Sequence, residues 1–275
     1  MSSTLYVVAT PIGNLEDMTL RALRVLKEVQ LIAAEDTRTT RKLLRRFGVR
    51  TPLLSYYEEN RQSRIPTILN QLVSGDVALV SEAGTPAISD PGRELVQAAV
   101  QAGYAVVPVP GASAVIVALA ASGLPSESFT FLGFLPRRRK ERRAVLQGVA
   151  GEPRTLVLFE APHRLRATLA DLVDVLGGDR PVAVCRELTK LYEEVHRGTV
   201  AQALARFVQP RGEFTLVIGG APVKGEAVVA DVERVKADLR ELKQQGLSAT
   251  EAVRAVARQY RLPRQQVYRL WITLR

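Results

Sequence analysis

Short apolar runs alternate with amphipathic stretches over the first 121 residues of the chain. Runs of the length and composition of buried strands occupy positions 5–9, 30–34, 53–54, 77–80 and 104–108. Stretches with the 3.6-residue period of an amphipathic helix occupy positions 19–29, 39–47, 58–73, 93–100 and 114–121. This regular alternation predicts a mostly parallel sheet with helices on both of its faces.

The next hundred residues have a different pattern. Strand-like segments rich in aromatic and β-branched residues lie at 129–135, 154–160, 181–188, 191–197 and 213–219. Helical periodicity appears between them at 165–175 and 200–208. The short gap between the third and fourth segments indicates a hairpin, so this second sheet is predicted to be mixed. The stretch 122–126, Ser-Gly-Leu-Pro-Ser, marks a domain boundary.

The remaining tail has the pattern of a small helical unit. A charged helix is predicted at 231–245, and Ser248 and Glu251 form a capping box that opens a second helix. A third helix is predicted from Pro263 onward. The arrangement of helix, short turn and helix, with Arg264, Arg269 and Arg275 expected to point outward, resembles a helix-turn-helix module. Nucleic-acid binding, a structural cap and a dimer contact all remain open for this unit.

These patterns divide the chain into three parts. We predict an N-terminal α/β domain at 1–122, a second α/β domain with a mixed sheet at 123–222, and a C-terminal helical module at 223–275.

The stretch 77–92 is the most informative segment of the first domain. The buried strand 77–80 runs into a loop of Gly, Ala, Ser, Thr and Pro, and a helix follows, for which Asp90 is the predicted N-cap and Pro91 the first residue. Small residues allow a ligand to approach the backbone directly. A ligand-binding loop is therefore favoured over a tight structural turn.

Two further small-residue loops also follow predicted strands. They lie at 10–17 and 110–114. Because ligands of open α/β sheets bind beyond the carboxyl ends of strands, the three loops predict a pocket that is lined largely by backbone and suits a nucleoside-like ligand. The G-x-G-x-x-G and P-loop signatures of common nucleotide sites are absent from the sequence, as are the G-x-S-x-G and H-E-x-x-H motifs of hydrolases.

Composition narrows the functional class. The 275 residues carry a formal net charge of +10, which favours a polyanionic partner such as RNA or DNA.

Cys185 is the only cysteine and there are two histidines, so neither a disulfide framework nor a zinc site is expected. No apolar run reaches the roughly 20 residues of a membrane helix. The N-terminus has no basic segment of the kind that opens a signal peptide, and we expect a cytoplasmic protein.

Two segments concentrate the positive charge. The first lies on one face of the helix predicted at 39–47 and just before it, and it comprises Arg38, Arg41, Lys42, Arg45 and Arg46. The second precedes and opens a helix after the strand 129–135, and it comprises Arg137, Arg138, Arg139, Lys140, Arg142 and Arg143. Cations are disfavoured at a helix N-terminus. Both segments are therefore interpreted as phosphate-binding surfaces, with an ordinary solvated surface as the alternative.

Seven motifs, in this order, resemble those of the tetrapyrrole methylase superfamily. They are Tyr6–Asp17 (YVVATPIGNLED), Glu35–Arg38 (EDTR), Leu79–Gly92 (LVSEAGTPAISDPG), Pro110–Ala114 (PGASA), Phe131–Pro136 (FLGFLP), Glu160–Leu165 (EAPHRL) and Cys185–Glu194 (CRELTKLYEE). The resemblance covers nearly the whole chain and is strongest to the branch that modifies small-subunit ribosomal RNA. Glu82 stands where that pattern has Asp, and Ala161 where it has Ser.

The resemblance implies a fold and an activity. It implies two α/β domains with a cofactor cleft between them, a homodimer, and S-adenosylmethionine as methyl donor. The implied reaction is 2′-O-methylation of a cytidine ribose in the decoding region of 16S ribosomal RNA, within the assembled small subunit. The positions that match cofactor contacts of the family are Pro11, Ile12, Thr85, Ile88, Ser113, Ala114, Glu160, Ala161 and Phe214.

Methyl transfer to a ribose hydroxyl needs positioning and help with proton removal. The candidate residues are Glu35, Asp36, His163, Glu187 and Lys190. The pair Glu187 and Lys190 is favoured, because an RNA hydroxyl needs a base and a cation nearby. Two other readings stay open. One is a precorrin-type methyltransferase of the same fold, and the other is a non-catalytic RNA-binding or ribosome assembly protein.

Overall fold

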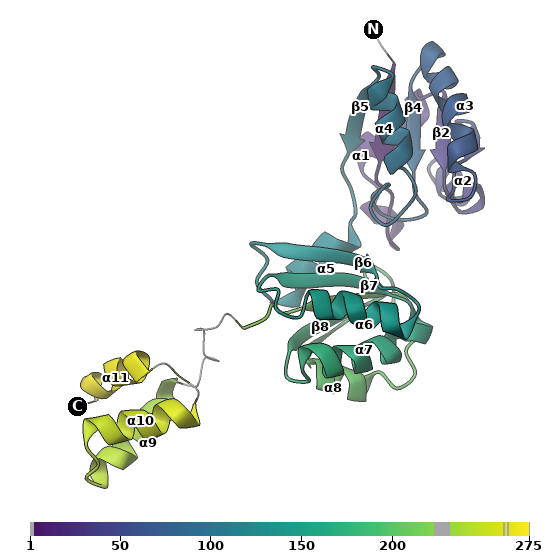
Figure 1. The fold of residues 1–275 in the computed structure, drawn as a ribbon. Coiled ribbons are helices and arrows are strands. Elements are labelled where there is room, and N and C mark those ends of the chain that lie inside the picture. The colour runs from purple at the N-terminus through teal and green to yellow at the C-terminus, as the bar shows by residue number, and fades with distance from the viewer. Residues whose placement is uncertain (1–2, 223–231, 261, 263, 275) are drawn as a thin grey trace. The chain divides into compact units, whose positions relative to one another are not determined.

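The protein is described here by a computed structural model, which covers residues 3–222, 232–260, 262 and 264–274. It divides into two compact units. The first contains residues 1–147 and 155–219, and the second contains residues 148–154 and 220–275. Both α/β sheets belong to the first unit (Figure 1). Across the described residues, none of the helices combines the length and the apolar character that crossing a membrane requires.

The first sheet is entirely parallel. It contains β1 (Thr4–Val8), β2 (Leu31–Ala34), β3 (Leu53–Ser55), β4 (Val77–Val80) and β5 (Ala105–Val109), in the order β3-β2-β4-β1-β5. Its helices are α1 (Leu20–Glu28), α2 (Thr37–Arg46), α3 (Arg61–Ser74) and α4 (Arg93–Gln101), with a short 3₁₀ turn at Leu15–Asp17. The predicted strand and helix order of this domain is confirmed.

Both faces of the first sheet are covered by helices. Leu26 of α1 and Leu44 of α2 pack with Ile32 on one face. Ile68 of α3 and Leu95 of α4 pack on the other face, in a cluster that also contains Leu5, Leu79 and the buried Tyr56. Two covered faces explain why the strands appear as continuous apolar runs instead of alternating patterns.

The second sheet is mixed, as predicted. It contains β6 (Phe129–Phe134), β7 (Thr155–Glu160), β8 (Pro181–Arg186), β9 (Glu194–Thr199) and β10 (Phe214–Ile218), in the order β6-β7-β10-β8-β9. The hairpin β8–β9 is antiparallel, whereas β6 and β7 are parallel. Its helices are α5 (Ala114–Ser122), α6 (Arg139–Gly148), α7 (Pro162–Leu176) and α8 (Val200–Arg206).

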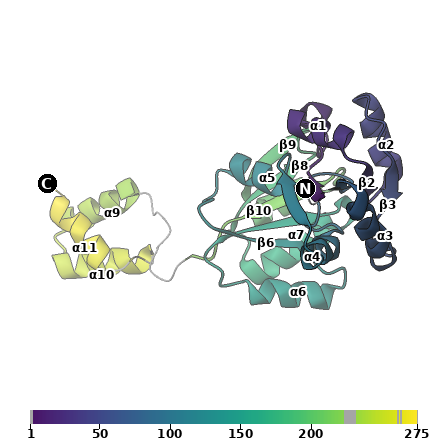
Figure 2. The ribbon, with the colours of Figure 1, turned by 90° about the horizontal axis from the view of Figure 1, so that it is seen from above.

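Helix α5 follows the first sheet in the chain but packs on the second. Its residues Val115, Ala118 and Leu119 form one cluster with Val157 of β7 and Val217 of β10. Helices α6, α7 and α8 lie on the opposite side of this sheet from α5 (Figure 1), and Figure 2 shows α5 and α6 apart in the same way. The layer built on the second sheet therefore begins at α5, before the boundary at residue 122 that composition alone suggests.

The C-terminal unit has its own hydrophobic core. It contains α9 (Val232–Gln244), α10 (Ala249–Gln259) and α11 (Arg264–Thr273), whose clustered residues include Leu239, Val256 and Val267. The predicted capping box is present, since the backbone N–H of Glu251 donates to Ser248 Oγ and the N–H of Ser248 donates to Glu251 Oε2. Positions 223–231, Pro263 and Arg275, on which part of the tail prediction rests, lie outside the described residues.

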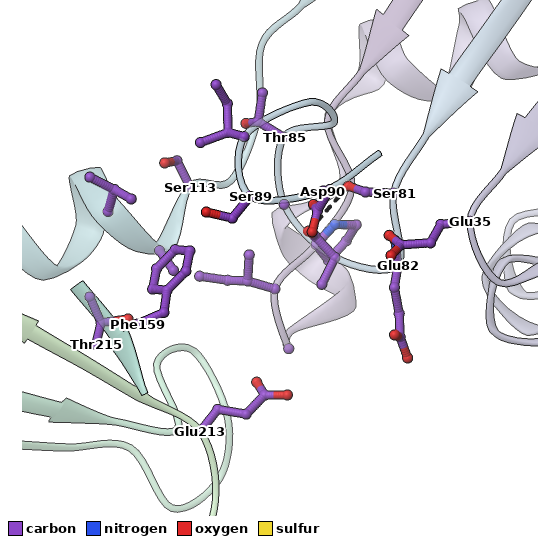
Figure 3. A pocket seen from close by; sticks show the side chains of 18 of the residues that line it. Glu35, Ser81, Glu82, Thr85, Ser89, Asp90, Ser113, Phe159, Glu213 and Thr215 are labelled. Carbon is purple, nitrogen blue, oxygen red and sulfur yellow. Dashed lines mark hydrogen bonds between the residues drawn. The ribbon is translucent and has the colours of Figure 1, made fainter. Parts of the chain in front are cut away.

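One local prediction about the central loop is wrong. Asp90 does not cap the following helix, because α4 begins at Arg93 with Gly92 as its N-cap. Gly92 has a φ of 151°, and a Cβ there would lie 2.9 Å from Leu79 Cδ2, so only glycine fits this turn without a shift. The turn points the Asp90 carboxylate toward Ser81 instead (Figure 3).

Candidate functional site: a cavity at the ends of both sheets

The loops that follow β1, β4 and β5 converge on one cavity of about 770 Å³. Such a volume lies within the ~300–1,000 Å³ range of small-molecule sites. The second sheet supplies the other wall, through residues at the ends of β6, β7 and β10. Figure 3 shows these two groups facing one another, with Phe159 and Thr215 opposite Ser89 and Asp90. The predicted convergence of the three loops is confirmed.

Backbone contacts hold the first and central loops together. Thr10 and Gly84 form an isolated antiparallel bridge, with N–O distances of 2.8 and 3.0 Å. A Cβ on Gly84 would lie 3.3 Å from Ile12 Cγ2, so the close approach favours glycine. Ala87 and Ser89 have φ values of 69° and 64°, a region that few non-glycine residues occupy. Strained backbone of this kind concentrates at functional sites.

Each position that matches a cofactor contact of the family lies on the wall of this cavity. The lining includes Pro11, Ile12, Thr85, Ile88, Ser113, Ala114, Glu160, Ala161 and Phe214. Ile88 and Phe134, which also line it, are 51% and 56% exposed. Apolar side chains left open to solvent around a concave site are typical of a surface that a ligand covers.

The charged lining of the cavity is mainly acidic. Its carboxylates are those of Glu35, Glu82, Asp90, Glu160 and Glu213, and its ammonium groups are those of Lys42 and Lys190. An acidic, partly apolar cavity suits a ligand that carries positive charge and an aromatic base. S-adenosylmethionine has a sulfonium, an ammonium and an adenine, so this set of donors and apolar surfaces fits it.

Of the favoured pair Glu187 and Lys190, only Lys190 lines the cavity, and the two are joined in a salt-bridged loop. Lys190 Nζ is 3.0 Å from Glu187 Oε1 and 2.8 Å from Glu213 Oε2. The pKa of the Glu187 carboxyl lies below its usual range. The largest cause is the hydrogen bond that the backbone N–H of Glu213 donates to this carboxylate. Burial lowers the pKa of Lys190, but its hydrogen bonds to the two carboxylates outweigh this effect and raise the pKa.

These bonds hold both side chains within the loop. A carboxylate with a lowered pKa is a weak proton acceptor, and an ammonium with a raised pKa stays charged. The same loop contacts the first domain, since the backbone N–H of Asn14 donates to Thr189 Oγ1 at 3.0 Å. Lys190 also packs so closely on Gly13 that a Cβ there would lie 2.4 Å from Lys190 Cγ.

The other candidates for proton removal differ in position. Asp36 is the N-cap of α2, and the backbone N–H of Arg38 donates to its side chain, which lowers the pKa of the carboxyl. His163 is exposed in the first turn of α7, and neither residue is found on the cavity wall. Glu35 does line the cavity, and burial raises the pKa of its carboxyl.

The two basic segments also differ. Lys42 of α2 lines the cavity. In α6, by contrast, the Arg142 side chain is only 5% exposed and its Nη2 lies 2.7 Å from Asp171 Oδ2, and Arg139 and Arg143 bind the same carboxylate. The interpretation of the 137–143 run as a free phosphate-binding surface is therefore corrected for Arg142, whose guanidinium is buried in an ion pair that bridges α6 to α7. Arg139 and Arg143 pair with the same carboxylate but stay 67% and 31% exposed.

Comparison with known proteins identifies the family. Residues 4–204 match the model of the Tetrapyrrole (Corrin/Porphyrin) Methylases. The chain is 50% identical over 273 residues, 98% of each chain, to a protein from Synechocystis sp. named ribosomal RNA small subunit methyltransferase I. Proteins of that name from Halalkalibacterium halodurans and Bacillus subtilis are 47% and 45% identical, and the matches cover 98% and 96% of this chain and 94% and 92% of those proteins.

The chain belongs to the tetrapyrrole methylase family, in its ribosomal RNA small subunit methyltransferase I branch. As a member of this family it is an S-adenosylmethionine-dependent methyltransferase.

Solved structures of tetrapyrrole methylases share the fold. Uroporphyrin-III C-methyltransferase from Thermus thermophilus, complexed with S-adenyl homocysteine, matches with a TM-score of 0.56 and 20% identity over 79% of this chain and 97% of that one. A cobalt precorrin-4 methyltransferase matches with a TM-score of 0.59 and 18% identity over 78% of this chain and 94% of that one. The predicted family and two-sheet architecture are confirmed.

Proposed function

We propose that the protein methylates the 2′-oxygen of a cytidine ribose in the decoding region of 16S ribosomal RNA, within the assembled small subunit and in the cytoplasm. The observation that supports this most strongly is the near-full-length similarity to proteins named for small-subunit ribosomal RNA, at 45–50% identity. A uroporphyrin-III C-methyltransferase and a cobalt precorrin-4 methyltransferase share the fold at 24% and 18% identity, which supports no common substrate.

The cavity walls suit methyl transfer from a bound donor. S-adenosylmethionine, when bound, supplies an activated methyl group on a sulfonium. Ile12, Ile88 and Phe159 give the cavity apolar surface between the two sheets, and the Thr10–Gly84 bridge fixes the first and central loops in place. Because the donor is already activated, holding it in line with the acceptor oxygen supplies much of the rate enhancement.

Helix α2 is the part of the first domain best placed to receive RNA. Arg41, Lys42, Arg45 and Arg46 are exposed, and within the described residues no ion pair is found for any of them. Thr39 and Lys42 of the same helix line the cavity. Phosphates bound along α2 would therefore bring a ribose to the end of the cavity that contains Glu35 and Asp90.

Labelled methyl transfer tests the proposed activity. The wild-type protein is incubated with methyl-labelled S-adenosylmethionine and small subunits that lack their native modification, and the RNA is digested to nucleosides. We expect one labelled 2′-O-methylcytidine that maps to the decoding region. Subunits that already carry the modification are the control and accept no label. Absence of label on subunits and on naked rRNA, with S-adenosylmethionine bound, would contradict the proposal.

We also propose that the protein is a homodimer, as the family resemblance implies. Large apolar side chains support this, because Leu191, Tyr192 and Ile116 are 89%, 68% and 55% exposed. Light scattering is expected to give a mass near twice the 30.1 kDa of one chain. A single-chain mass across micromolar concentrations would contradict the proposal.

A further inference from the structure

The carboxylates of the cavity differ in what already binds them. Glu213 is paired with Lys190, and Glu35 accepts a hydrogen bond from the backbone N–H of Glu82 at 3.1 Å. Glu160 is buried, and its oxygens accept from Thr168 Oγ1 at 2.5 Å and from the Ala161 N–H at 2.9 Å. Each of these three groups is held by a backbone N–H or by a charged side chain.

Asp90 differs from these groups. Within the described residues no basic side chain is found paired with it, and its hydrogen-bond partner is the hydroxyl of Ser81 (Figure 3). In Figure 3 the Asp90 carboxylate lies between Phe159 and Thr215 on one side and Glu35 and Glu82 on the other. It therefore lies between the second-sheet wall of the cavity and the end that α2 flanks.

We propose that Asp90 is the catalytic proton acceptor for the ribose 2′-hydroxyl. This inference rests on the proposed function. In the step, the 2′-oxygen forms a bond to the methyl carbon while the carbon–sulfur bond of the sulfonium breaks and its electron pair stays on sulfur. The hydroxyl proton passes to the Asp90 carboxylate and is then released to solvent. Atoms and charge balance without a further reactant.

The environment of Asp90 tunes its carboxyl for this task. Burial is the main cause that raises its pKa to about 6, and the negative charge of Glu35 adds to the effect. A general base is most effective when its pKa lies close to the working pH. The charged groups that line the cavity around Asp90 are Glu35 and Glu82 from the loops of the first sheet, Lys42 from α2, Glu160 at the end of β7, and Lys190 and Glu213 from loops of the second sheet.

Ser81 can serve both protonation states of Asp90. Its side chain is buried, and its Oγ also lies 3.2 Å from the carbonyl oxygen of Ala83. A hydroxyl has one proton to donate but can also accept. Ser81 can therefore donate to the Asp90 carboxylate before the reaction. Once Asp90 is protonated, Ser81 can donate to Ala83 and accept from Asp90.

The central loop fixes the Asp90 backbone. Ala87 and Ser89 adopt positive φ values, and Gly92 packs against Leu79 and Ala87. A reacting group on such a constrained loop loses little freedom on reaching the transition state. On a flexible loop, the Asp90 carboxylate would instead occupy many positions relative to the substrate.

Single-turnover kinetics of Asp90→Asn tests the inference. Asparagine has nearly the same shape and keeps a hydrogen bond to Ser81, but it cannot accept the proton. We expect methyl transfer to unmodified small subunits to slow by roughly 100-fold or more. The dissociation constant of S-adenosylmethionine, measured by calorimetry, is expected to stay within about threefold of wild type. Asp179→Asn changes an exposed aspartate in the turn before β8 and is the control that keeps the wild-type rate.

The pH profile separates this role from a structural one. The wild-type rate is expected to rise as the pH passes about 6 and then level off, because the ionised carboxylate is the active form. Asp90→Asn loses this rise, and Asp90→Glu recovers part of the rate because it restores a carboxylate. A rate for Asp90→Asn within threefold of wild type would overturn the inference, and so would a loss fully explained by weaker cofactor binding. If wild type itself transfers no methyl group to RNA, the proposed function fails first.

Discussion

The two basic segments have similar composition but different surroundings. On α2, which lines the cavity through Thr39 and Lys42, Arg41, Arg45 and Arg46 are exposed, and no acidic partner is found for them in the described part of the chain. In the 137–143 segment, which leads into α6, three of the six cations converge on Asp171, whose side chain is 1% exposed. Positive charge in a sequence therefore has two uses here: α2 is available to a polyanion, whereas half of the cations in the 137–143 segment join α6 to α7.

The ion pairs between α6 and α7 also explain why cations stand at the N-terminus of α6. Cations at a helix N-terminus oppose the helix dipole, at roughly 0.3–1 kcal/mol each. Asp171 and Asp174 of α7 supply the opposing negative charge. The neighbouring helix thus compensates for the unfavourable placement, and no bound phosphate is required.

The largest effect is expected from Asp171→Asn. The change leaves the buried Arg142 guanidinium without its charged partner, and breaking a buried pair in this way costs about 3–5 kcal/mol. Thermal unfolding followed by circular dichroism should show a lowered melting temperature. Asp174→Asn is the matched control, because Asp174 is 47% exposed and an exposed pair contributes at most about 1 kcal/mol. If both variants lowered the melting temperature equally, the buried and the exposed ion pair would contribute equally to stability, contrary to this prediction.

A smaller effect is expected from neutralising α2. In the triple variant Arg41→Gln, Arg45→Gln and Arg46→Gln, the affinity for small subunits should fall by at least about 10-fold, and the slope of log affinity against log salt should fall by about 2. Filter binding over a range of salt concentrations measures both. The helix itself should persist, because removing like charges four residues apart relieves repulsion. An unchanged salt slope would show that α2 does not contact phosphate.

The smallest effect is expected from the exposed remainder of the α6 segment. Arg138 is 85% exposed and pairs with Glu141 at 3.3 Å, and Lys140 is also exposed. The double variant Arg138→Gln and Lys140→Gln should change subunit affinity by no more than about threefold and leave the melting temperature unchanged. A loss as large as that of the α2 variant would make the two segments equivalent as RNA contacts.

Much of the fold follows from local pattern. The strand 77–80 is observed with the predicted limits, and the hairpin between residues 181 and 199 follows from the short gap between its strands. The loop cavity follows from the rule that ligands bind at the carboxyl ends of parallel strands.

The roles of Arg142 and Asp90 could not be predicted in the same way. Arg142 meets Asp171, 29 residues away, only after α6 and α7 pack together. Asp90 precedes a helix and resembles an N-cap, but the Pro91–Gly92 turn moves the helix start to Arg93. Sequence spacing alone places a carboxylate near a helix. It does not fix which group the carboxylate faces or how deeply it is buried.

The central claim is that α2 brings RNA to the acidic end of the cavity. The most direct measurement is steady-state methyl transfer to unmodified small subunits by wild type, the α2 triple variant and the Arg138/Lys140 double variant. We predict that KM for subunits rises at least about 10-fold in the α2 variant alone, with kcat and the KM for S-adenosylmethionine near wild type. An α2 variant with an unchanged KM for subunits would contradict the account.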